Sequence, residues 1–367
     1  MAHDTFRLKL PIQGLVEEIL NQLPDHVWTD PNTMFLDPAF GGGQFILAIE
    51  RRLKAAGHSD SNIADRVYGC ESLPTRVKYV QNWFKSGLTN LFVRNAVAHD
   101  WGNMKFDVII GNPPYQDPTK PNSHNLWCSF VETAWQLVKP DGHVAFVTPN
   151  VGRRREVLQV FQNHHVVWYN GADVKSHFAG VGSTFCAWVI QNKPKTEAAT
   201  LIKQLDGELV CVHIPHNMPF WPLHVTPDTM QFIAHMTQGE SKLDVRTDWG
   251  YHTQGKAAWF NDTPTKKFKY EFQNTSSNKK YCSQDHEKRT SAKVICSKSG
   301  YLKPWFDAGN MGVTENSWVV PVRNAKHAKQ VIEFLESDSV KQFVNLATGG
   351  NTMVNDPQIY RMLSWNA

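Results

Sequence analysis

The stretch that most constrains the fold of this chain is Phe106–Gly111, a short apolar run rich in β-branched residues. A run that is apolar almost throughout, without alternation, is typical of a strand buried on both faces of a parallel sheet. It leads directly into Asn112-Pro113-Pro114-Tyr115. Two prolines fix φ and lack amide hydrogens, so they predict a stiff loop with free carbonyl groups at the carboxyl end of the strand.

The residue types in this loop suit the recognition of a planar ring that carries an amino group. The side-chain oxygen of Asn112 and the carbonyl of Pro113 can each accept a hydrogen bond from one NH₂ group, and Tyr115 can stack on the ring. The exocyclic amine of adenine is a poor nucleophile, because its lone pair is delocalised into the ring. Two acceptors on its hydrogens favour tetrahedral nitrogen and localise that lone pair. A structural turn that merely ends a strand is the alternative that this tetrapeptide alone leaves open.

A second junction between a strand and a loop lies at residues 34–45. Apolar residues 34–36 lead into Asp37 and a turn with three consecutive glycines, and a helical pattern then continues through Leu53. A strand that enters a glycine turn at the start of a helix is typical of a nucleotide-type site. The spacing matches neither a dinucleotide fingerprint nor a Walker loop, which disfavours a phosphate cradle. The acid beside the turn favours a ligand that carries an ammonium group.

Acidic residues follow the next two predicted strands. Residues 66–71 read as a strand that ends at Glu71, the position where doubly wound folds hold ribose hydroxyls. A third strand or turn near residues 91–97 leads to Asp100 and Trp101, an acid and an aromatic that suit an adenine ring and its amino group. A single surface acid would be uninformative, but acids after successive strands point to a binding site.

Helical patterns alternate with these strands through the first half of the chain. After the Asn-Pro-Pro-Tyr loop, a helix is expected at 126–137, followed by strands at 143–148, 166–169 and 183–190. This alternation predicts an α/β fold, a doubly wound and mostly parallel sheet with helices on both faces.

Together these motifs resemble the gamma class of amino DNA methyltransferases, in particular the N6-adenine branch found in Type II and Type IIG restriction–modification systems. The resemblance covers residues 8–192 and implies a Rossmann-like class I methyltransferase fold with S-adenosyl-L-methionine as cofactor. Residues 112–115 match the catalytic loop without departure, whereas Gly42 stands where Ser or Thr is common. The order of cofactor motifs, catalytic loop and target-recognition region is that of the gamma class.

The resemblance implies a role for each matching residue. Asn112, Pro113, Pro114 and Tyr115 would form the catalytic loop, with Asn112 also near the cofactor. The family begins with a proline-containing helix over the methionine end of the cofactor, which residues 10–16 match. In the family an aromatic residue late in the domain stacks on the flipped base, and Phe185 and Trp188 lie in the matching stretch. The implied cofactor-binding residues are Pro11, Asp37, Pro38, Ala39, Phe40, Gly41, Gly43, Phe45, Glu71, Asp100 and Trp101.

The chain changes in composition after residue 192. A polar break at 193–200 predicts a catalytic domain at residues 1–195 and a mixed α/β target-recognition domain at residues 196–367. Residues 251–303 contain eleven lysines and arginines but four acids, a net charge of +7, with aromatic residues interleaved. Such a stretch is a candidate nucleic-acid face, with Lys266, Lys267 and Lys269 as candidate phosphate contacts, and a solvated basic loop is the alternative.

The overall composition narrows the class of protein further. The chain has 367 residues and a net charge of +4, which allows a polyanionic partner. Its six cysteines are scattered without a Cys-x-x-Cys pair, which favours a reduced cytoplasmic protein without a structural metal site. There is no run of about 18 apolar residues and no signal-peptide pattern, so no membrane association is expected.

The sequence therefore predicts S-adenosylmethionine-dependent methylation of adenine N6 in a specific double-stranded DNA site, after the base is flipped out of the duplex. One alternative is an amino methyltransferase acting on RNA or on a protein glutamine, although enzymes of those kinds lack a basic C-terminal domain of this size. The other is a catalytically inactive nucleic-acid-binding protein with the same fold. Double-stranded DNA is the expected partner, and a cognate restriction endonuclease is expected to be a separate protein.

Overall fold

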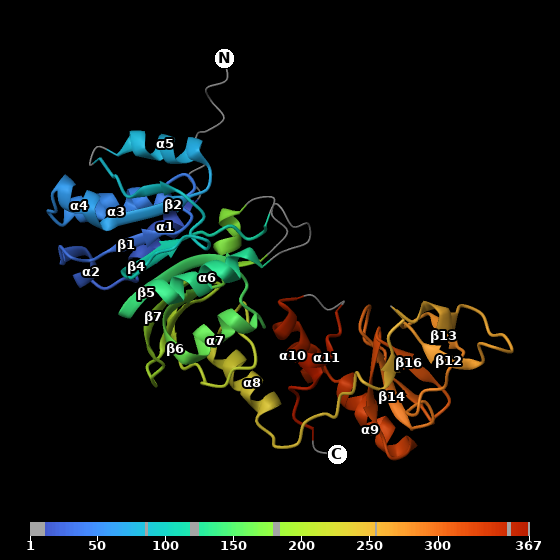
Figure 1. The fold of residues 1–367 in the computed structure, drawn as a ribbon. Coiled ribbons are helices and arrows are strands. Elements are labelled where there is room, and N and C mark those ends of the chain that lie inside the picture. The colour runs from blue at the N-terminus through green and yellow to red at the C-terminus, as the bar shows by residue number, and fades with distance from the viewer. Residues whose placement is uncertain are drawn as a thin grey trace. The chain divides into compact units, whose positions relative to one another are not determined.

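The structure is a computed structural model that describes residues 12–84, 87–117, 125–178, 184–253, 255–350 and 354–365 (Figure 1). The chain divides into two units, Met1–Met230 and Gln231–Ala367. Each unit has its own β-structure, and each is described by itself. No helix among the described residues is long and apolar enough to cross a membrane.

A nine-stranded sheet forms the centre of the first unit, in the order β3-β2-β1-β4-β5-β7-β6-β8-β9. Strands β1 to β5 pair in parallel, whereas β7 runs antiparallel to both β5 and β6. This is the mostly parallel, doubly wound α/β sheet that the sequence predicts. The strands are β1 (Phe35–Asp37), β2 (Val67–Glu71), β3 (Leu91–Val93), β4 (Phe106–Gly111), β5 (Val138–Pro149), β6 (His164–Asn170), β7 (Phe185–Pro194), β8 (Thr200–Lys203) and β9 (Leu209–Val212).

Helices connect these strands and pack on the sheet. Helix α1 contacts α3 and β7, whereas α6 contacts β5 and α7 contacts β6. The helices of this unit are α1 (Ile12–Leu20), α2 (His26–Thr29), α3 (Gln44–Ala55), α4 (Asp60–Arg66), α5 (Pro74–Trp83), α6 (Leu126–Leu137) and α7 (Arg155–Asn163), with a 3₁₀ turn η1 (Val174–His177). Helix α8 (Pro227–Thr237) spans the division between the units.

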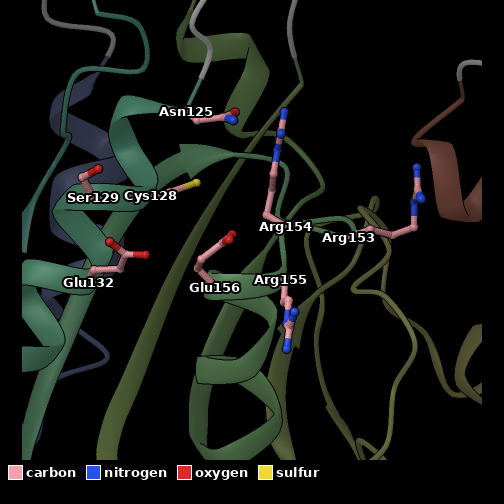
Figure 2. A pocket seen from close by; sticks show the side chains of 8 residues that line it. All are labelled: Asn125, Cys128, Ser129, Glu132, Arg153, Arg154, Arg155 and Glu156. Atoms are coloured by element: carbon pink, nitrogen blue, oxygen red, sulfur yellow. The ribbon is translucent and has the colours of Figure 1, made fainter. Parts of the chain in front are cut away.

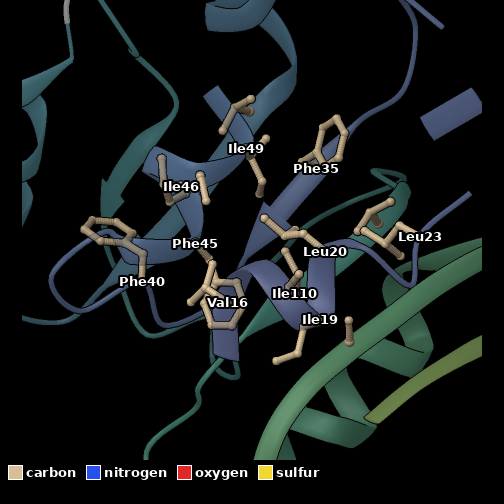
Figure 3. Close-up of a cluster of buried hydrophobic side chains, with 14 of the residues drawn as sticks. Val16, Ile19, Leu20, Leu23, Phe35, Phe40, Phe45, Ile46, Ile49 and Ile110 are labelled. Carbon is tan, nitrogen blue, oxygen red and sulfur yellow. The ribbon is translucent and has the colours of Figure 1, made fainter. Parts of the chain in front are cut away.

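The core beneath α1 and α3 shows why the sheet has two distinct faces. Val16, Ile19 and Leu20 on α1 pack with Phe35 of β1 and Ile110 of β4 (Figure 3). Successive side chains of a strand point to opposite faces, so alternate residues of one strand belong to different layers. In β7, the alternate residues 185, 187 and 189 belong to this cluster. Apolar burial on both faces explains why these strands read as continuous hydrophobic runs.

The division between the units lies later in the chain than the sequence predicts. The polar break at 193–200 connects β7 to β8, and β8 pairs with β6 in the same sheet. A polar connection therefore marks a turn within the first unit, which continues to Met230 rather than ending near residue 195.

The second unit has the mixed α/β texture expected of the C-terminal half. A five-stranded sheet has the order β10-β16-β12-β13-β11, and a three-stranded sheet has the order β15-β14-β17. The strands are β10 (Gly250–Tyr251), β11 (Phe260–Asn261), β12 (Tyr270–Gln273), β13 (Lys279–Cys282), β14 (Lys293–Ser297), β15 (Trp305–Asp307), β16 (Gly312–Thr314) and β17 (Ser317–Pro321). The helices are α9 (Ala325–Leu335), α10 (Asp338–Thr348) and α11 (Pro357–Tyr360), with a 3₁₀ turn η2 (Ala257–Trp259).

Candidate active site

The candidate site is built at the carboxyl edge of the first sheet. Strands β2, β1 and β4 lie side by side and run in the same direction. They end at Glu71, Asp37 and Gly111. Because the carboxyl ends of parallel strands share one edge of a sheet, the fold brings the two acids and the start of the Asn112 loop together there.

Asp37 is the most perturbed acid at this edge. Its side chain is 1% exposed, and burial raises its pKa to about 8, with the nearby Glu71 charge acting in the same direction. Its Oδ1 accepts a 3.1 Å hydrogen bond from the amide of Ala39, which partly opposes that rise. No lysine, arginine or histidine among the described residues forms an ion pair with it. A buried carboxylate without a counter-ion is a favourable partner for a cationic ligand group.

Gly111 allows Asp37 to lie directly against the catalytic loop. A Cβ atom at Gly111 would be 2.6 Å from Oδ1 of Asp37, closer than any real contact. Only glycine therefore fits between the end of β4 and this carboxylate. Gly111 thus allows the Asp37 side chain and the start of the Asn112 loop, which belong to two separate sequence motifs, to lie in contact.

The glycine turn is fixed to the neighbouring strand and to a helix. The amide of Phe40 donates a 3.0 Å hydrogen bond to the carbonyl of Cys70, at the end of β2. Gly43 has φ of 82°, and a Cβ atom there would meet Val80 of α5 at 2.9 Å. The rings of Phe40 and Phe45 are buried in the core cluster, so they anchor the turn to the core. The remaining predicted residues of the turn, Pro38, Ala39 and Gly41, lie between Asp37 and Gly43.

Glu71 is also held in a defined position. It is 7% exposed, and its Oε1 accepts hydrogen bonds from the amide of Leu73 (2.9 Å) and the hydroxyl of Ser72 (3.1 Å). Arg76 lies 3.5 Å from Oε2. These contacts leave Oε2 with the remaining capacity to accept hydrogen bonds from a ligand.

The other predicted cofactor residues have different surroundings. Asp100 is exposed, and its Oδ1 accepts a 2.9 Å hydrogen bond from the amide of Gly102. Trp101 is 7% exposed, and its indole N–H donates to the carbonyl of Ala96 while its ring packs on Phe106. The Trp101 ring is therefore a core side chain with little free surface. Pro11 lies outside the described residues.

The Asn112 loop has a hydrogen bond of its own. The Tyr115 hydroxyl donates to Oδ1 of Asn112 at 2.5 Å. Burial raises the pKa of Tyr115 well above its usual value, so the hydroxyl stays protonated and acts as a donor. Pro113 is buried and Pro114 is exposed, while the Asn112 and Tyr115 side chains are both partly accessible.

The Tyr115 ring is supported by two phenylalanines. Its centroid lies 5.0 Å from that of Phe185 and 6.4 Å from that of Phe178, and the two phenylalanine rings are 4.7 Å apart. Phe185 is 1% exposed, whereas Phe178 is only partly buried. Phe178 follows η1, and sequence reasoning missed it because no motif or periodicity relates it to the loop.

The sequence predicts Trp188 as a candidate for the aromatic ring that stacks on the flipped base, and its position in the structure contradicts this. It is fully buried, its indole N–H donates to Oγ1 of Thr148 at 3.0 Å, and its ring contacts Phe146 and Phe161. The physical reason is the two-residue period of β7, which puts residues 185 and 188 on opposite faces of the sheet. Trp188 belongs to the core beneath α7 and has no ring face open to a ligand.

The basic stretch of the second unit is only partly neutralised. Five of its cations form ion pairs with carboxylates, namely Lys279 with Glu271, Lys280 with Asp262, Lys288 with Glu287, Arg289 with Asp285 and Lys293 with Asp307. Lys266, Lys267 and Lys269 are exposed between β11 and β12, and none of the three has an ion pair with a described residue. Two of them lie over rings, Lys267 over Phe268 and Lys269 over Tyr270.

Comparisons with known proteins agree with this geometry. Residues 50–164, which include β2, β4 and the Asn112 loop, match the family described as Eco57I restriction-modification methylase. The match confirms the resemblance to restriction–modification methylases that the motifs indicate. No curated protein sequence matches the chain.

Several solved structures resemble nearly the whole chain. They include a nuclease-deletion mutant of the Type ISP restriction-modification enzyme LlaGI with a DNA substrate mimic (TM-score 0.54, 10% identity, 95% of this chain and 46% of that one). The Type ISP enzyme LlaBIII bound to DNA has a TM-score of 0.52 at 11% identity and covers 97% of this chain and 37% of its own. The Type IIL enzyme MmeI in complex with DNA has a TM-score of 0.50 at 12% identity, with 96% and 65% covered.

At these identities the likeness shows the fold, and the chain spans less than two thirds of the length of each of these structures. The first unit therefore has the class I methyltransferase fold. The fold and the matched methylase family together imply S-adenosylmethionine as the cofactor.

Proposed function

We propose that this chain is an S-adenosylmethionine-dependent DNA methyltransferase that acts on N6 of adenine in a specific double-stranded site. The observation that carries the proposal is the Asn112 loop, which follows β4 directly and adjoins the buried acid Asp37. The target amine of adenine lies inside a base pair, so the base has to leave the duplex to reach such a loop.

The residues at the sheet edge fit the cofactor. S-adenosylmethionine supplies a methyl group on a positively charged sulfur. Asp37 is a buried carboxyl group that forms no ion pair with a described residue, and its ionisation would suit a cationic ligand. Glu71 keeps accepting capacity for ribose hydroxyls. The glycine turn lets the backbone approach a ligand closely, because Gly41 and Gly43 have positive φ.

The Asn112 loop would hold the target amine. Oδ1 of Asn112 and the carbonyl of Pro113 would each accept a hydrogen bond from N6, which concentrates the nitrogen lone pair toward the methyl donor. Tyr115 does not serve as a base, since its pKa is raised and its hydroxyl is already a donor to Asn112. The loop thus works by positioning and hydrogen bonding rather than by proton abstraction.

The aromatic residues beside the loop would hold the base ring. Tyr115 and Phe178 are both partly accessible, and both contact the buried ring of Phe185. We therefore assign Phe178 and Tyr115 as the rings that contact the flipped adenine, with Phe185 as the ring that supports them. Stacking on such rings is worth about 1–3 kcal/mol per base.

The second unit would position the DNA. Its lysines at 266, 267 and 269 are exposed and lack ion pairs with described residues, as phosphate contacts would require. The solved structures of LlaGI, LlaBIII and MmeI that resemble this chain contain DNA or a DNA substrate mimic. A cognate endonuclease would be supplied by another protein or another segment.

Sequencing that detects modified bases tests this function in cells. DNA from cells that express the protein should carry N6-methyladenine at one recurrent sequence, and DNA from cells that express an Asn112→Ala variant should not. Modified cytosine at the recurrent site, or unmodified DNA beside methylated RNA or protein glutamine, would contradict the proposal.

A further inference from the structure

An arginine-lined pocket opens between the starts of α6 and α7 in the first unit (Figure 2). Its volume is about 390 Å³, and its lining includes Arg153, Arg154 and Arg155. Asn125, Ser129 and two acids, Glu132 and Glu156, are the other polar residues of the lining apart from the Cys128 thiol. None of these residues belongs to the cofactor site or to the Asn112 loop.

The pocket lies at the same sheet edge as the catalytic loop. Strand β5 pairs in parallel with β4, with Gly111 opposite Phe146, so both strands end at one edge. The Asn112 loop follows β4, and the arginines follow β5. Neighbouring strands of a sheet are about 5 Å apart, so the two loops leave the sheet as neighbours.

Two of the arginines in this pocket, Arg154 and Arg155, are available to a ligand. The side chains of Arg154 and Arg155 are exposed and make no hydrogen bond or ion pair with a described residue. In Figure 2 the Arg154 side chain extends in the direction of Asn125, while Glu132 and Glu156 lie farther from Asn125. Arg154 lines the pocket together with Cys128.

We propose that this pocket binds a backbone phosphate of the DNA strand that carries the flipped adenine, with Arg154 as its main contact. The inference rests on the proposed function and adds a phosphate site in the catalytic unit, separate from the basic stretch of the second unit. A guanidinium pairs with phosphate through two parallel hydrogen bonds. A nucleotide that rotates out of the duplex turns about its own backbone, so a fixed phosphate beside the catalytic loop holds the pivot. Glu132 and Glu156 repel phosphate, which restricts it to the side of the pocket where Arg154 and Asn125 lie.

A variant that removes the positive charge of Arg154, together with a control that removes a positive charge elsewhere, tests the phosphate site. Arg154→Gln removes the main contact, and Lys105→Gln removes one positive charge from an exposed residue that directly precedes β4, on the opposite edge of the sheet. Binding of a fluorescent duplex is measured by anisotropy across a potassium chloride series. Each phosphate contact contributes about 0.9 to the slope of log K against log salt, so Arg154→Gln should reduce the slope by about 1 and Lys105→Gln should leave it unchanged. Affinity for S-adenosylmethionine should be the same in all three proteins, which also checks that the variants are folded.

A second variant should have the opposite effect on DNA binding. Glu156→Gln removes a negative charge from the pocket, so it should strengthen DNA binding at every salt concentration. If Arg154→Gln keeps the wild-type slope, or changes it no more than Lys105→Gln does, this phosphate site is wrong. If the wild type methylates adenine and only the slope prediction for Arg154→Gln fails, the proposed function still stands. A wild-type protein that neither binds nor methylates DNA would overturn both the proposed function and the phosphate site.

Discussion

The hydroxyl of Tyr115 donates a hydrogen bond of 2.5 Å to Oδ1 of Asn112, three residues earlier in the same loop. The bond orients the amide of Asn112. A donating hydroxyl needs an acceptor, and Oδ1 can accept whereas the amide nitrogen can only donate. The same oxygen retains a second lone pair, which is the one that the target amine would use. In the proposed function, this bond would hold the Asn112 amide in position before any ligand enters.

Removing this hydroxyl should loosen the catalytic amide. Tyr115→Phe keeps the ring but loses the hydrogen bond, which is worth about 0.5–1.5 kcal/mol, so turnover should fall about 2- to 10-fold. Affinity for S-adenosylmethionine should not change. Single-turnover methylation rates measure the first effect and calorimetry the second; wild-type turnover in Tyr115→Phe would show that the hydroxyl does not position Asn112.

Asp37 should make cofactor binding and stability depend on pH. Its pKa in the folded, ligand-free protein is raised to about 8 from an ordinary value of 3.8. The folded state therefore binds more protons than the unfolded state between these values, and the contribution of Asp37 to stability is lost as the pH rises from about 4 to 8. A cationic ligand favours the ionised carboxylate, so its binding should release a proton and tighten as the pH rises to about 8.

Asp37→Asn is the variant that separates these effects. It should remove the proton release seen by calorimetry in buffers of different ionisation enthalpy, and it should weaken S-adenosylmethionine binding by about 1.5–3 kcal/mol. Without ligand, its melting temperature should vary less between pH 4 and pH 8 than that of the wild type. Equal affinity and equal proton release in the two proteins would exclude Asp37 from the cofactor site.

Phe178 and Trp188 should respond to substitution in opposite ways. Phe178→Ala removes a partly accessible ring beside Tyr115, so it should lower methylation and reduce the fluorescence of 2-aminopurine placed at the target position, with little loss of stability. Trp188→Ala leaves a cavity among Phe146 and Phe161 and should cost about 3–5 kcal/mol of unfolding free energy. A Phe178→Ala variant with full activity and an unchanged 2-aminopurine signal would remove this ring from the base site.

The exposed lysines between β11 and β12 should govern non-specific DNA affinity. Replacing Lys266, Lys267 and Lys269 together with glutamine should reduce the salt slope by up to about 3 and weaken binding to all sequences similarly. The matched control replaces Lys326, Lys329 and Lys341, which are exposed on α9 and α10 of the same unit. Equal slopes in the two triple variants would place the DNA on another surface.

The features that the sequence predicts are those set by local pattern. Continuous apolar runs locate β4 and β7, and the glycine turn and Asn112 loop are placed by spacing alone. The features that it misses depend on long-range geometry. The face on which Trp188 lies depends on the register of β7, the position of Phe178 depends on how η1 packs, and Lys293 is buried against Asp307 because β14 pairs with β15.

The boundary of the first unit shows the same limit. A polar, charged connection at 193–200 has the composition of a domain linker, yet β8 returns to pair with β6. Local composition reports exposure to solvent, and it does not report whether the next strand rejoins the same sheet.

The identity of the nucleoside that receives the methyl group decides whether the protein methylates N6 of adenine. Purified protein is incubated with DNA and S-adenosylmethionine that carries a deuterated methyl group, and the DNA is digested to nucleosides for mass spectrometry. We expect label in N6-methyl-deoxyadenosine with the wild type and a loss of about 10²-fold or more with Asn112→Ala, which should still bind the cofactor. Label in a methylated cytosine, or equal label in N6-methyl-deoxyadenosine with both proteins, would contradict this expectation.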